Sequence, residues 1–484
     1  MCRIIGLVDN RSKKKLSKKD IEILITMRDS MSDGGPDDFG LFEENNVGLG
    51  HRRLSIIDLT DSGKQPMIFE NWVISFNGEI YNYKEIKKKL IKCNIKFSTD
   101  TDTEVIVKAI DYWGIKAINK FHGMFAFALW NRISNKLLLC RDRLGVKPLH
   151  WYLKDDLLLF SSEIKGFHSH PDFDNEINLK SIPHFFKKGY IKPTESIFKY
   201  VNKVVPGTVI EFTNNLKYNV KKYWDIDKIF NKTIINFSDK VETEKRLKKV
   251  LISSFNYRMV SDVPVGIFLS GGIDSSLVAS ILQSKKEKPI KTFTIGFKDD
   301  KFNESKIAEE ISKILGTDHK TYYCDEKDFK KIIPKLSNVY DEPFGDSSAI
   351  PTCLICELAS KEIKVVLSGD GGDELFGGYS KYHFTSYSNI ILSIPLPIRR
   401  IIYNLSFLIS GNLVEKISRL LNVSSFGQIA NKYSKFQNTL LSTSVDDFFE
   451  RASSYISNEK LQLLTNSDLK QDLISKKSLK NRLM

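Results

Sequence analysis

The spacing of hydrophobic residues differs between the first and the second half of the chain. In the first half, short segments of alternating apolar and polar residues are separated by turn residues, a pattern that predicts β-strands. The clearest of these strands are expected at residues 47–57, 72–80 and 124–130. Apolar residues at helical spacing predict amphipathic helices at 84–93 and 103–113. We expect a β-rich sandwich with helices on its outer faces.

The second half alternates apolar runs of strand length with helical patterns. The strands are expected at residues 263–269, 290–297 and 365–367, and the helices at 277–282 and 304–315. Such alternation is typical of a parallel α/β sheet.

The 484 residues are enough for several domains, each with its own core. A polar, turn-rich stretch that includes Asn231-Lys232-Thr233 separates the two patterns, and a helix is expected from Lys240 to Phe255. We therefore expect a first domain at residues 1–215, a linker at 216–240 and a second domain at 241–484.

Composition narrows the class of protein. With 41% hydrophobic and 27% charged residues, the chain has the balance of a soluble globular protein. The net charge is +14, but lysines are scattered along the chain, so we expect no nucleic-acid partner. The run Lys13-Lys14-Lys15 is expected to form a solvated face. Six widely spaced cysteines indicate a reducing compartment without a disulfide framework.

We expect no membrane segment. The most apolar stretch, residues 390–409, is interrupted by Pro395, Pro397 and the pair Arg399-Arg400. A spanning helix needs about 20 uninterrupted apolar residues. The first residues also lack the long apolar region of a signal peptide. The predicted location is the cytoplasm.

The stretch from Ser270 to Ser276 is a candidate phosphate-binding loop. It lies between a predicted strand and a predicted helix, where free backbone N–H groups and the positive helix end face an anion. Gly271 and Gly272 allow a close approach, the serines add hydroxyl donors, and Asp274 could hold a divalent cation. A simple glycine turn with Asp274 as a helix cap is the alternative.

A second glycine-rich loop, from Ser368 to Tyr379, follows the strand expected at 365–367. In open α/β sheets, ligands bind at loops that follow the strand ends. The carboxylates of Asp370 and Asp373 suit a Mg²⁺–phosphate site with a nearby acid or base.

Cys2 is a candidate nucleophile. Removal of the initiator Met would leave a cysteine whose own α-amine, with an ordinary pKa of about 8, can act as its base. Arg53 offers a planar fork for a carboxylate, and Asp102 could bind an ammonium group. The Asn77 side chain and the Gly78 N–H are suitable donors for an oxyanion.

Together these groups describe hydrolysis of the side-chain amide of a free amino acid such as glutamine. Each also has an ordinary structural explanation: a surface ion pair for Arg53, a turn for Asn77-Gly78 and a helix cap for Asp102.

The first half resembles the class II glutamine amidotransferase domain, which is an α+β four-layer N-terminal-nucleophile hydrolase. The resemblance rests on Met1-Cys2, residues 52–56 and 76–82, Asp102, and residues 123–127, 141–149 and 161–165. It implies that Cys2 is the nucleophile. The glutamine-binding residues that it implies are Arg53, Leu54, Ser55, Ile56, Ile57, Asn77, Gly78, Glu79 and Asp102.

Two positions depart from that pattern. Arg3 stands where the family usually has a small residue, which places a bulky charge beside Cys2. The family's usual His-Arg-Gly-Pro-Asp reads Asp33-Gly34-Gly35-Pro36-Asp37 here. We expect Arg3 to alter access to the site without abolishing the chemistry.

The second half resembles the PP-loop ATPases, which cleave ATP to AMP and pyrophosphate. Combined with the first half, it is similar to the glutamine-hydrolysing asparagine synthetase family, on residues 261–266, 340–348 and the Ser368 loop. The ATP-binding residues that the resemblance implies are Leu269, Ser270, Gly271, Gly272, Asp274, Ser275, Ile295, Ser368 and Gly369. It places Asp274 and Asp373 on Mg²⁺, and Asp370 as the acid of the β-aspartyl-AMP step.

The resemblance implies that ammonia released at Cys2 travels inside the protein to an activated aspartate, and it suggests a homodimer. Two alternatives stay open: an acceptor that is a sugar acid or other carboxylate, and a remnant that only hydrolyses glutamine. The chain ends at Asn481-Arg482-Leu483-Met484 in a Lys-rich region, and we expect that the family's C-terminal segment is missing because the chain is a fragment or frameshifted product.

Overall fold

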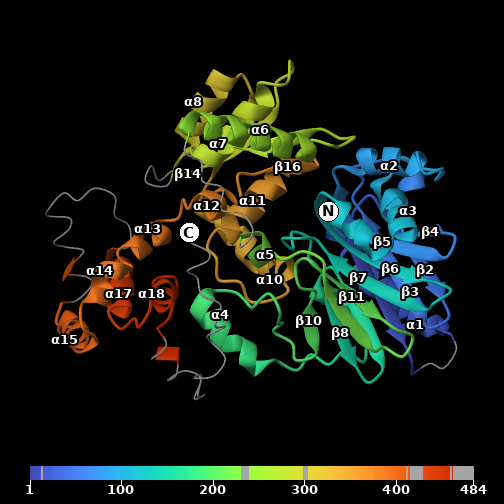
Figure 1. Cartoon of the computed structure of the whole chain (residues 1–484), viewed down its shortest axis with the longest axis horizontal. Coiled ribbons are helices and arrows are strands. Elements are labelled where there is room, and N and C mark those ends of the chain that lie inside the picture. The colour runs from blue at the N-terminus through green and yellow to red at the C-terminus, as the bar shows by residue number, and fades with distance from the viewer. Residues whose placement is uncertain are drawn as a thin grey trace.

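Two six-stranded antiparallel sheets form the first half of the computed structural model (Figure 1). The structure describes residues 1–11, 15–230, 239–297, 303–409, 413–414, 429–457 and 460–461. Residues Lys13-Lys14, Asn231-Lys232-Thr233 and the chain end from Asn481 to Met484, on which the sequence raised expectations, lie outside these ranges.

The first sheet has the strand order β10-β8-β9-β1-β3-β2. Its strands are β1 (Arg3–Asp9), β2 (Asp38–Glu44), β3 (Val47–Arg53), β8 (His150–Lys154), β9 (Leu157–Ser161) and β10 (Val201–Lys203). The second sheet has the order β12-β11-β7-β6-β5-β4. Its strands are β4 (Met67–Phe69), β5 (Trp72–Ile80), β6 (Gly123–Asn131), β7 (Lys136–Arg141), β11 (Thr208–Phe212) and β12 (Tyr218–Lys222).

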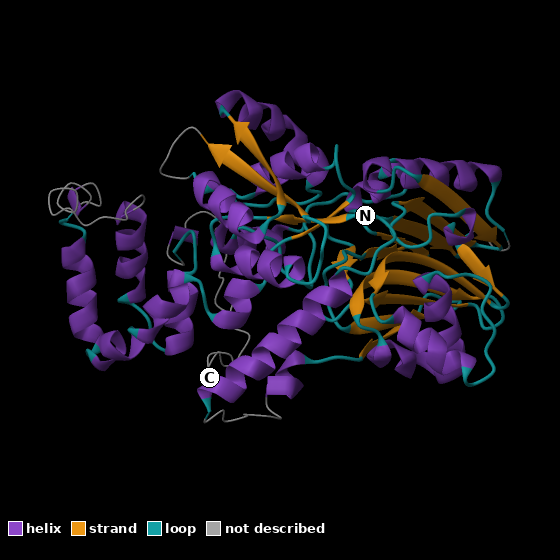
Figure 2. Ribbon diagram, turned by 90° about the horizontal axis from the view of Figure 1, so that it is seen from above, coloured by secondary structure: helices purple, strands orange, loops and turns teal. Residues whose placement is uncertain are grey.

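Alternation along the strands builds four layers. In β1, Ile4 and Val8 face the second sheet, whereas Ile5 and Leu7 face α1 (Lys18–Asp29). In β5, Val73 joins the core between the sheets, whereas Phe76 packs against α3 (Asp102–Trp113). With α2 (Tyr83–Ile91), these helices cover the two outer faces (Figure 2). The predicted helix–sheet–sheet–helix arrangement is confirmed.

A four-stranded parallel sheet of order β15-β14-β13-β16 forms the second half. Its strands are β13 (Val265–Phe268), β14 (Lys291–Phe297), β15 (Asp318–Cys324) and β16 (Val365–Leu367). The helices around it are α6 (Lys240–Arg258), α7 (Ile273–Gln283), α8 (Ser305–Leu315), α9 (Glu326–Ile332), α10 (Leu336–Val339) and α11 (Ala349–Ala359). Apolar clusters on both faces of the sheet confirm the α/β prediction.

The remaining helices are short. They are α4 (Ile182–Lys188), α5 (Ile226–Phe230), α12 (Gly372–Phe376), α13 (Ser380–Ser386), α14 (Ser388–Ser393), α15 (Leu396–Ser406), α17 (Ile429–Thr439) and α18 (Val445–Ala452). Within the described ranges, every helix is too short or too polar to cross a bilayer.

Polar contacts join the two halves. Asp341 accepts a hydrogen bond from the backbone N–H of Ile164 at 2.5 Å, and Lys203 pairs with Glu342 at 2.5 Å. Burial raises the pKa of Asp341. The N-terminus lies where the halves meet in both views (Figures 1 and 2), so the start of the chain faces the second half.

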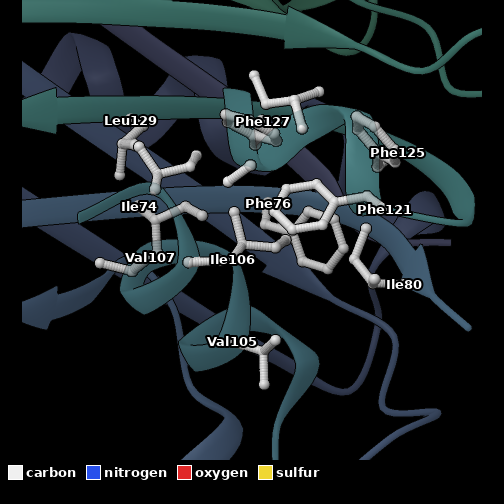
Figure 3. Close-up of a cluster of buried hydrophobic side chains, with 14 of the residues drawn as sticks. Ile74, Phe76, Ile80, Val105, Ile106, Val107, Phe121, Phe125, Phe127 and Leu129 are labelled. Carbon is white, nitrogen blue, oxygen red and sulfur yellow. The ribbon is translucent and has the colours of Figure 1, made fainter. Parts of the chain in front are cut away.

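The cluster between the second sheet and α3 supplies a test of the layered architecture. Phe127 is fully buried in it (Figure 3). We expect Phe127→Ala to lower the free energy of unfolding of the first half by about 3–5 kcal/mol, because it removes buried surface and leaves a cavity. Urea unfolding followed by tryptophan fluorescence measures this. Ile133, which is 71% exposed, is the control, and equal losses for Ile133→Ala would contradict the architecture.

Candidate active sites

Cys2 lies just before the central strand β1. The antiparallel register of β1 and β3 pairs Arg3 with Arg52, which brings residue 2 beside the end of β3. The Cys2 Sγ accepts a hydrogen bond from the Leu54 N–H at 3.3 Å and lies 3.5 Å from the Leu54 carbonyl oxygen. Burial raises the pKa of the Cys2 thiol, and the Leu54 N–H, the α-amine and Arg53 oppose that rise.

Two cationic side chains, Arg3 and Lys147, lie close to the α-amine at the start of the chain. Burial and the charge of Arg3 lower the pKa of the Met1 α-amine to about 5, and Lys147 adds to this effect. Burial also lowers the pKa of Lys147 to about 8, and its ammonium contacts the Met1 sulfur. The neighbouring cations therefore favour the neutral form of an amine at the chain start, and a general base must be neutral.

The sequence analysis did not single out Lys147 as a site residue. It lies between Val146 and Pro148, in a stretch whose resemblance to the family was noted only for the stretch as a whole. The one feature that could have drawn attention to it is that a lysine stands between apolar residues. Only the fold shows that it is 1% exposed beside the chain start.

Asn77 has the properties of a ligand-binding group. Its side chain lies fully buried in β5, and within the described structure neither its Oδ1 nor its Nδ2 has a hydrogen-bond partner. An unpaired buried amide costs stability, so proteins rarely keep one without a function. The next residue, Gly78, has φ = 147°, and a Cβ there would lie 2.1 Å from the Met124 carbonyl oxygen. Only glycine fits at residue 78.

Two buried carboxyl groups lie beside this amide. Burial raises the pKa of Asp102 to about 7 although the Ile80 N–H donates to it at 2.9 Å. Burial and the neighbouring Asp102 raise the pKa of Glu79 to about 7, and Lys147 and the α-amine oppose that rise. Glu79 therefore lies within electrostatic range of Asp102, Lys147 and the α-amine. The N-cap of α3 is Thr101, and Asp102 is the first residue of the helix, where the backbone N–H groups of Asp102 and Thr103 also lower the pKa of its carboxyl.

Arg53 is buried, and within the described ranges no salt bridge joins it to a carboxylate. Its guanidinium donates to the backbone oxygens of Thr60, at 2.9 Å, and of Asp58. It therefore braces the loop that follows Leu54 and keeps an unneutralised positive charge close to Cys2 and Asp102. The surface ion pair considered from the sequence is not formed.

Of the other predicted glutamine-binding residues, Ser55 and Ile57 contact the first half and Ile56 contacts the second half. The Ser55 N–H donates to Asp37 at 2.8 Å, and the Ile56 carbonyl accepts from the Asp262 N–H at 2.9 Å. The Ile57 carbonyl lies 3.5 Å from the Arg53 guanidinium. Segment 54–57 is therefore held from both sides.

In the second half, the Ser270 loop joins β13 to α7. Gly272 is the N-cap of α7 and has no side chain to cap it, so the first N–H groups of the helix remain available to an anion. Within the loop, the Ser270 N–H donates to Ser275 Oγ at 3.0 Å, and the Gly271 N–H donates to Glu304 at 3.2 Å. The Gly272 N–H donates to Ser270 Oγ, so side chains of this chain occupy two N–H groups of the loop, and its binding of phosphate stays a prediction.

The two glycine-rich loops lie together because β13 and β16 are parallel neighbours. A Cβ on Gly372 would lie 2.2 Å from the Asp274 carboxylate, and one on Gly369 would lie 2.8 Å from the Ser275 backbone nitrogen. The glycines therefore allow the Ser368 loop to pack directly on Asp274. The fold brings together the loops that the sequence placed almost a hundred residues apart.

The donor set here fits a magnesium ion held jointly with phosphates. Asp274 contacts Gly372, the neighbour of Asp373, and Ser368 Oγ donates to Asp370 at 2.8 Å. Across the described residues, no group of three or more His, Cys, Asp or Glu side chains could hold a metal. Mg²⁺ commonly takes only one or two carboxylates plus substrate phosphates, so the chemistry of Asp274 and Asp373 is compatible with such a site, and their role as its ligands stays a prediction.

The two residues expected to flank adenine adjoin through the sheet, since the Leu269 N–H donates to the Phe293 carbonyl at 2.9 Å, but their side chains pack in different clusters. Leu269 is buried in the cluster under α7, and Ile295 on β14 packs in the cluster with α9 and α11. The structure does not bring them into one cluster.

Comparison with known proteins matches a different family model to each half of the chain. Residues 1–224 match the family model described as "Glutamine amidotransferase domain", and residues 246–473 match the model described as "Asparagine synthase". The chain is 37% identical, over 80% of its length, to the Methanocaldococcus jannaschii protein named "Putative asparagine synthetase [glutamine-hydrolyzing] 2". It is 35% identical, over 79% of its length, to asparagine synthetase [glutamine-hydrolyzing] 1 of Bacillus subtilis.

These similarities define a glutamine amidotransferase joined to an ATP-dependent ligase domain. The chain belongs to the glutamine-hydrolysing asparagine synthetase family. It spans 77% of the M. jannaschii relative and 59% of the B. subtilis relative. The solved glutamine PRPP amidotransferase of B. subtilis overlaps 66% of this chain and 65% of that chain at 15% identity with a TM-score of 0.35, a similarity too weak to decide the fold.

The unpartnered amide of Asn77 supplies a test that is independent of activity. We expect Asn77→Leu to leave the first half unchanged or to stabilise it by about 1 kcal/mol, because it removes two unsatisfied buried polar atoms. Asn82 is the matched control, since its buried amide is satisfied by the Lys120 carbonyl and the His122 N–H, each at 2.9 Å. Asn82→Leu should destabilise by about 1–3 kcal/mol. Thermal unfolding of both variants measures this, and equal losses would show that Asn77 is paired.

Proposed function

We propose that this chain synthesises asparagine from aspartate, with glutamine as nitrogen donor and ATP as the activating substrate. Family membership supports this, and the observation that carries the proposal is the buried, unpartnered Asn77 amide in the same site as a cysteine at the chain start. Two sites are needed because free ammonia is protonated at neutral pH, and the ammonium ion is not a nucleophile.

In the proposed first reaction, the neutral α-amine of processed Cys2 takes the thiol proton, and the thiolate attacks the glutamine side-chain amide. The Asn77 Nδ2 and the Gly78 N–H stabilise the oxyanion. Its collapse breaks the C–N bond, the α-ammonium returns the proton, and ammonia leaves. Water then hydrolyses the thioester to glutamate. Arg53 and Asp102 hold the carboxylate and ammonium of glutamine.

In the proposed second reaction, an aspartate side-chain carboxylate attacks the α-phosphorus of ATP and pyrophosphate leaves. The Ser270 loop and the open N-terminus of α7 bind the pyrophosphate. Asp274 and Asp373 would hold Mg²⁺, which neutralises phosphate charge when bound. Ammonia then displaces AMP from the acyl-adenylate, and Asp370 is placed to take the proton that ammonia loses.

The domain division at residues 1–215, 216–240 and 241–484 stays a prediction, and its boundaries do not follow the elements exactly. Strand β12, which lies in the predicted linker, pairs with β11 in the second sheet, and α6 begins at Lys240, one residue before the predicted second domain. A cytoplasmic location and a homodimer remain predictions, and size-exclusion chromatography coupled to light scattering tests the dimer.

Replacement of the nucleophile separates the two reactions. We expect Cys2→Ala to lower glutamine-dependent asparagine formation at least about 100-fold, because the thioester cannot form. Synthesis from ammonium chloride should stay within about twofold of wild type, since the second site is untouched. Asparagine and pyrophosphate are quantified with each nitrogen source. Cys140→Ala, at a buried cysteine outside the site, is the control.

Three results would contradict the proposal. Pyrophosphate release with a sugar acid but not with aspartate would identify a different acceptor. Glutamine hydrolysis without pyrophosphate release for any acceptor would identify a glutaminase. An active enzyme that mass spectrometry shows to retain Met1 would exclude the α-amine of Cys2 as base.

The buried carboxyls predict a pH dependence. The pKa of Asp102 is raised to about 7, so it becomes protonated as the pH falls below 7 and loses its attraction for the glutamine ammonium. We expect KM for glutamine to rise toward about tenfold per pH unit below pH 6, with Glu79 titrating in the same range. Asp102→Asn should give a high KM that no longer follows this rise. A KM independent of pH in the wild type would show that Asp102 is not the ammonium ligand.

A further inference from the structure

Arg3 makes a clamp around the backbone of Cys2. Its side chain is 16% exposed and turns back along the chain start, where its Nη1 donates to the carbonyl oxygens of Met1, at 2.9 Å, and Cys2, at 3.2 Å. Its Nε pairs with the carboxylate of Glu163. One guanidinium therefore joins the carbonyl of the nucleophilic residue to an acid that follows β9.

The other side of Arg3 packs on Gly34, the last residue of a short 3₁₀ turn at Ser32–Gly34. A Cβ on Gly34 would lie 2.5 Å from the Arg3 Cζ, 2.6 Å from its Nε and 2.8 Å from its Cγ. Gly34 is not among the residues with positive φ, so the need for glycine is steric. The Arg3 side chain fills the space that a side chain at residue 34 would occupy.

The two departures from the family pattern are therefore neighbours in space. The resembling motif has arginine at the position of Gly34 and a small residue at the position of Arg3. In this chain the arginine and the small residue have exchanged places. We propose that Arg3 is a positioning residue for the nucleophile, which supplies from β1 the guanidinium that the motif carries at residue 34 and fixes the Cys2 backbone to Glu163.

The acid of this clamp is itself firmly held. The second carboxylate oxygen of Glu163 pairs with Lys165 at 3.2 Å. Between them, the Ile164 N–H donates to Asp341 of the second half at 2.5 Å. A charge-assisted hydrogen bond to a carboxylate fixed in this way holds its donor more tightly than one to a mobile surface acid.

The clamp has a chemical consequence for the reaction proposed above, on which this inference rests. Removal of Met1 deletes one of the two carbonyl contacts and leaves the contact to the Cys2 carbonyl. The new α-amine then lies one residue from the guanidinium of Arg3, whose charge lowers the pKa of an amine at the chain start, as Lys147 does, whereas Glu163 raises that pKa. Arg3 thus orients the nucleophile and helps to keep its base free of a proton.

The test is an exchange of the two residues. We expect Arg3→Gly to lower kcat for glutamine hydrolysis about tenfold with a smaller change in KM, and to shift the acidic limb of the pH profile upward. Gly34→Arg alone should be at least as impaired, because two side chains compete for one space. The double variant Arg3→Gly/Gly34→Arg should recover most of the lost kcat. Arg3→Lys, which keeps the charge without the fork, should recover the pH profile more than kcat.

Further measurements distinguish a misfolded variant from a failure of the inference about Arg3 and from a failure of the proposed function. Ammonium-dependent asparagine synthesis and thermal unfolding report whether each variant is folded. The rate of Cys2 alkylation by iodoacetamide against pH, followed by mass spectrometry, reports the thiol even if glutamine is not the substrate. Wild-type kcat and alkylation profile in Arg3→Gly, or a double variant no better than Arg3→Gly, would overturn the inference. A wild type that does not hydrolyse glutamine would instead overturn the proposed function.

Discussion

The antiparallel pairing of β1 with β3 is the constraint on which the first site depends. β1 lies inside the sheet with β3 on one side and β9 on the other, and its apolar residues are buried on both faces. Such a strand has little freedom to slip, since a shift by one residue would turn its core side chains to the wrong face. Because Cys2 immediately precedes β1, the fixed register of the strand also fixes the position of the Cys2 backbone.

The second site has a different origin. Its two loops are joined by no local contact in sequence and meet because β13 and β16 are parallel neighbours whose ends lie at one edge. Glycine at residues 369 and 372 then removes the side chains that would hold the loops apart. In the second site, Asp274 and Asp373 lie in the first turns of α7 and α12, and Asp370 lies in the loop before α12. In the first site, Glu79 lies on β5 and Asp102 begins α3.

The sequence predicts those strands and helices whose own pattern of apolar and polar residues determines their structure. The strand expected at 72–80 is β5, and the helix expected at 103–113 is α3 within one residue. The strand expected at 47–57 is too long, because the chain leaves the sheet after Arg53 to surround Cys2. The polar β15 was missed, since its neighbours in the sheet rather than its own residues determine it. The burial of Lys147 and the contact of Arg3 with Gly34 depend on tertiary proximity, which spacing along the chain does not encode.

The contact between Ile164 and Asp341 links the two catalytic units mechanically. Ile164, whose N–H donates to Asp341 of the second half, directly follows Glu163, the acid that pairs with Arg3. Loss of this one hydrogen bond would therefore release the segment that fixes Arg3, although Asp341 and Cys2 lie in different halves of the chain.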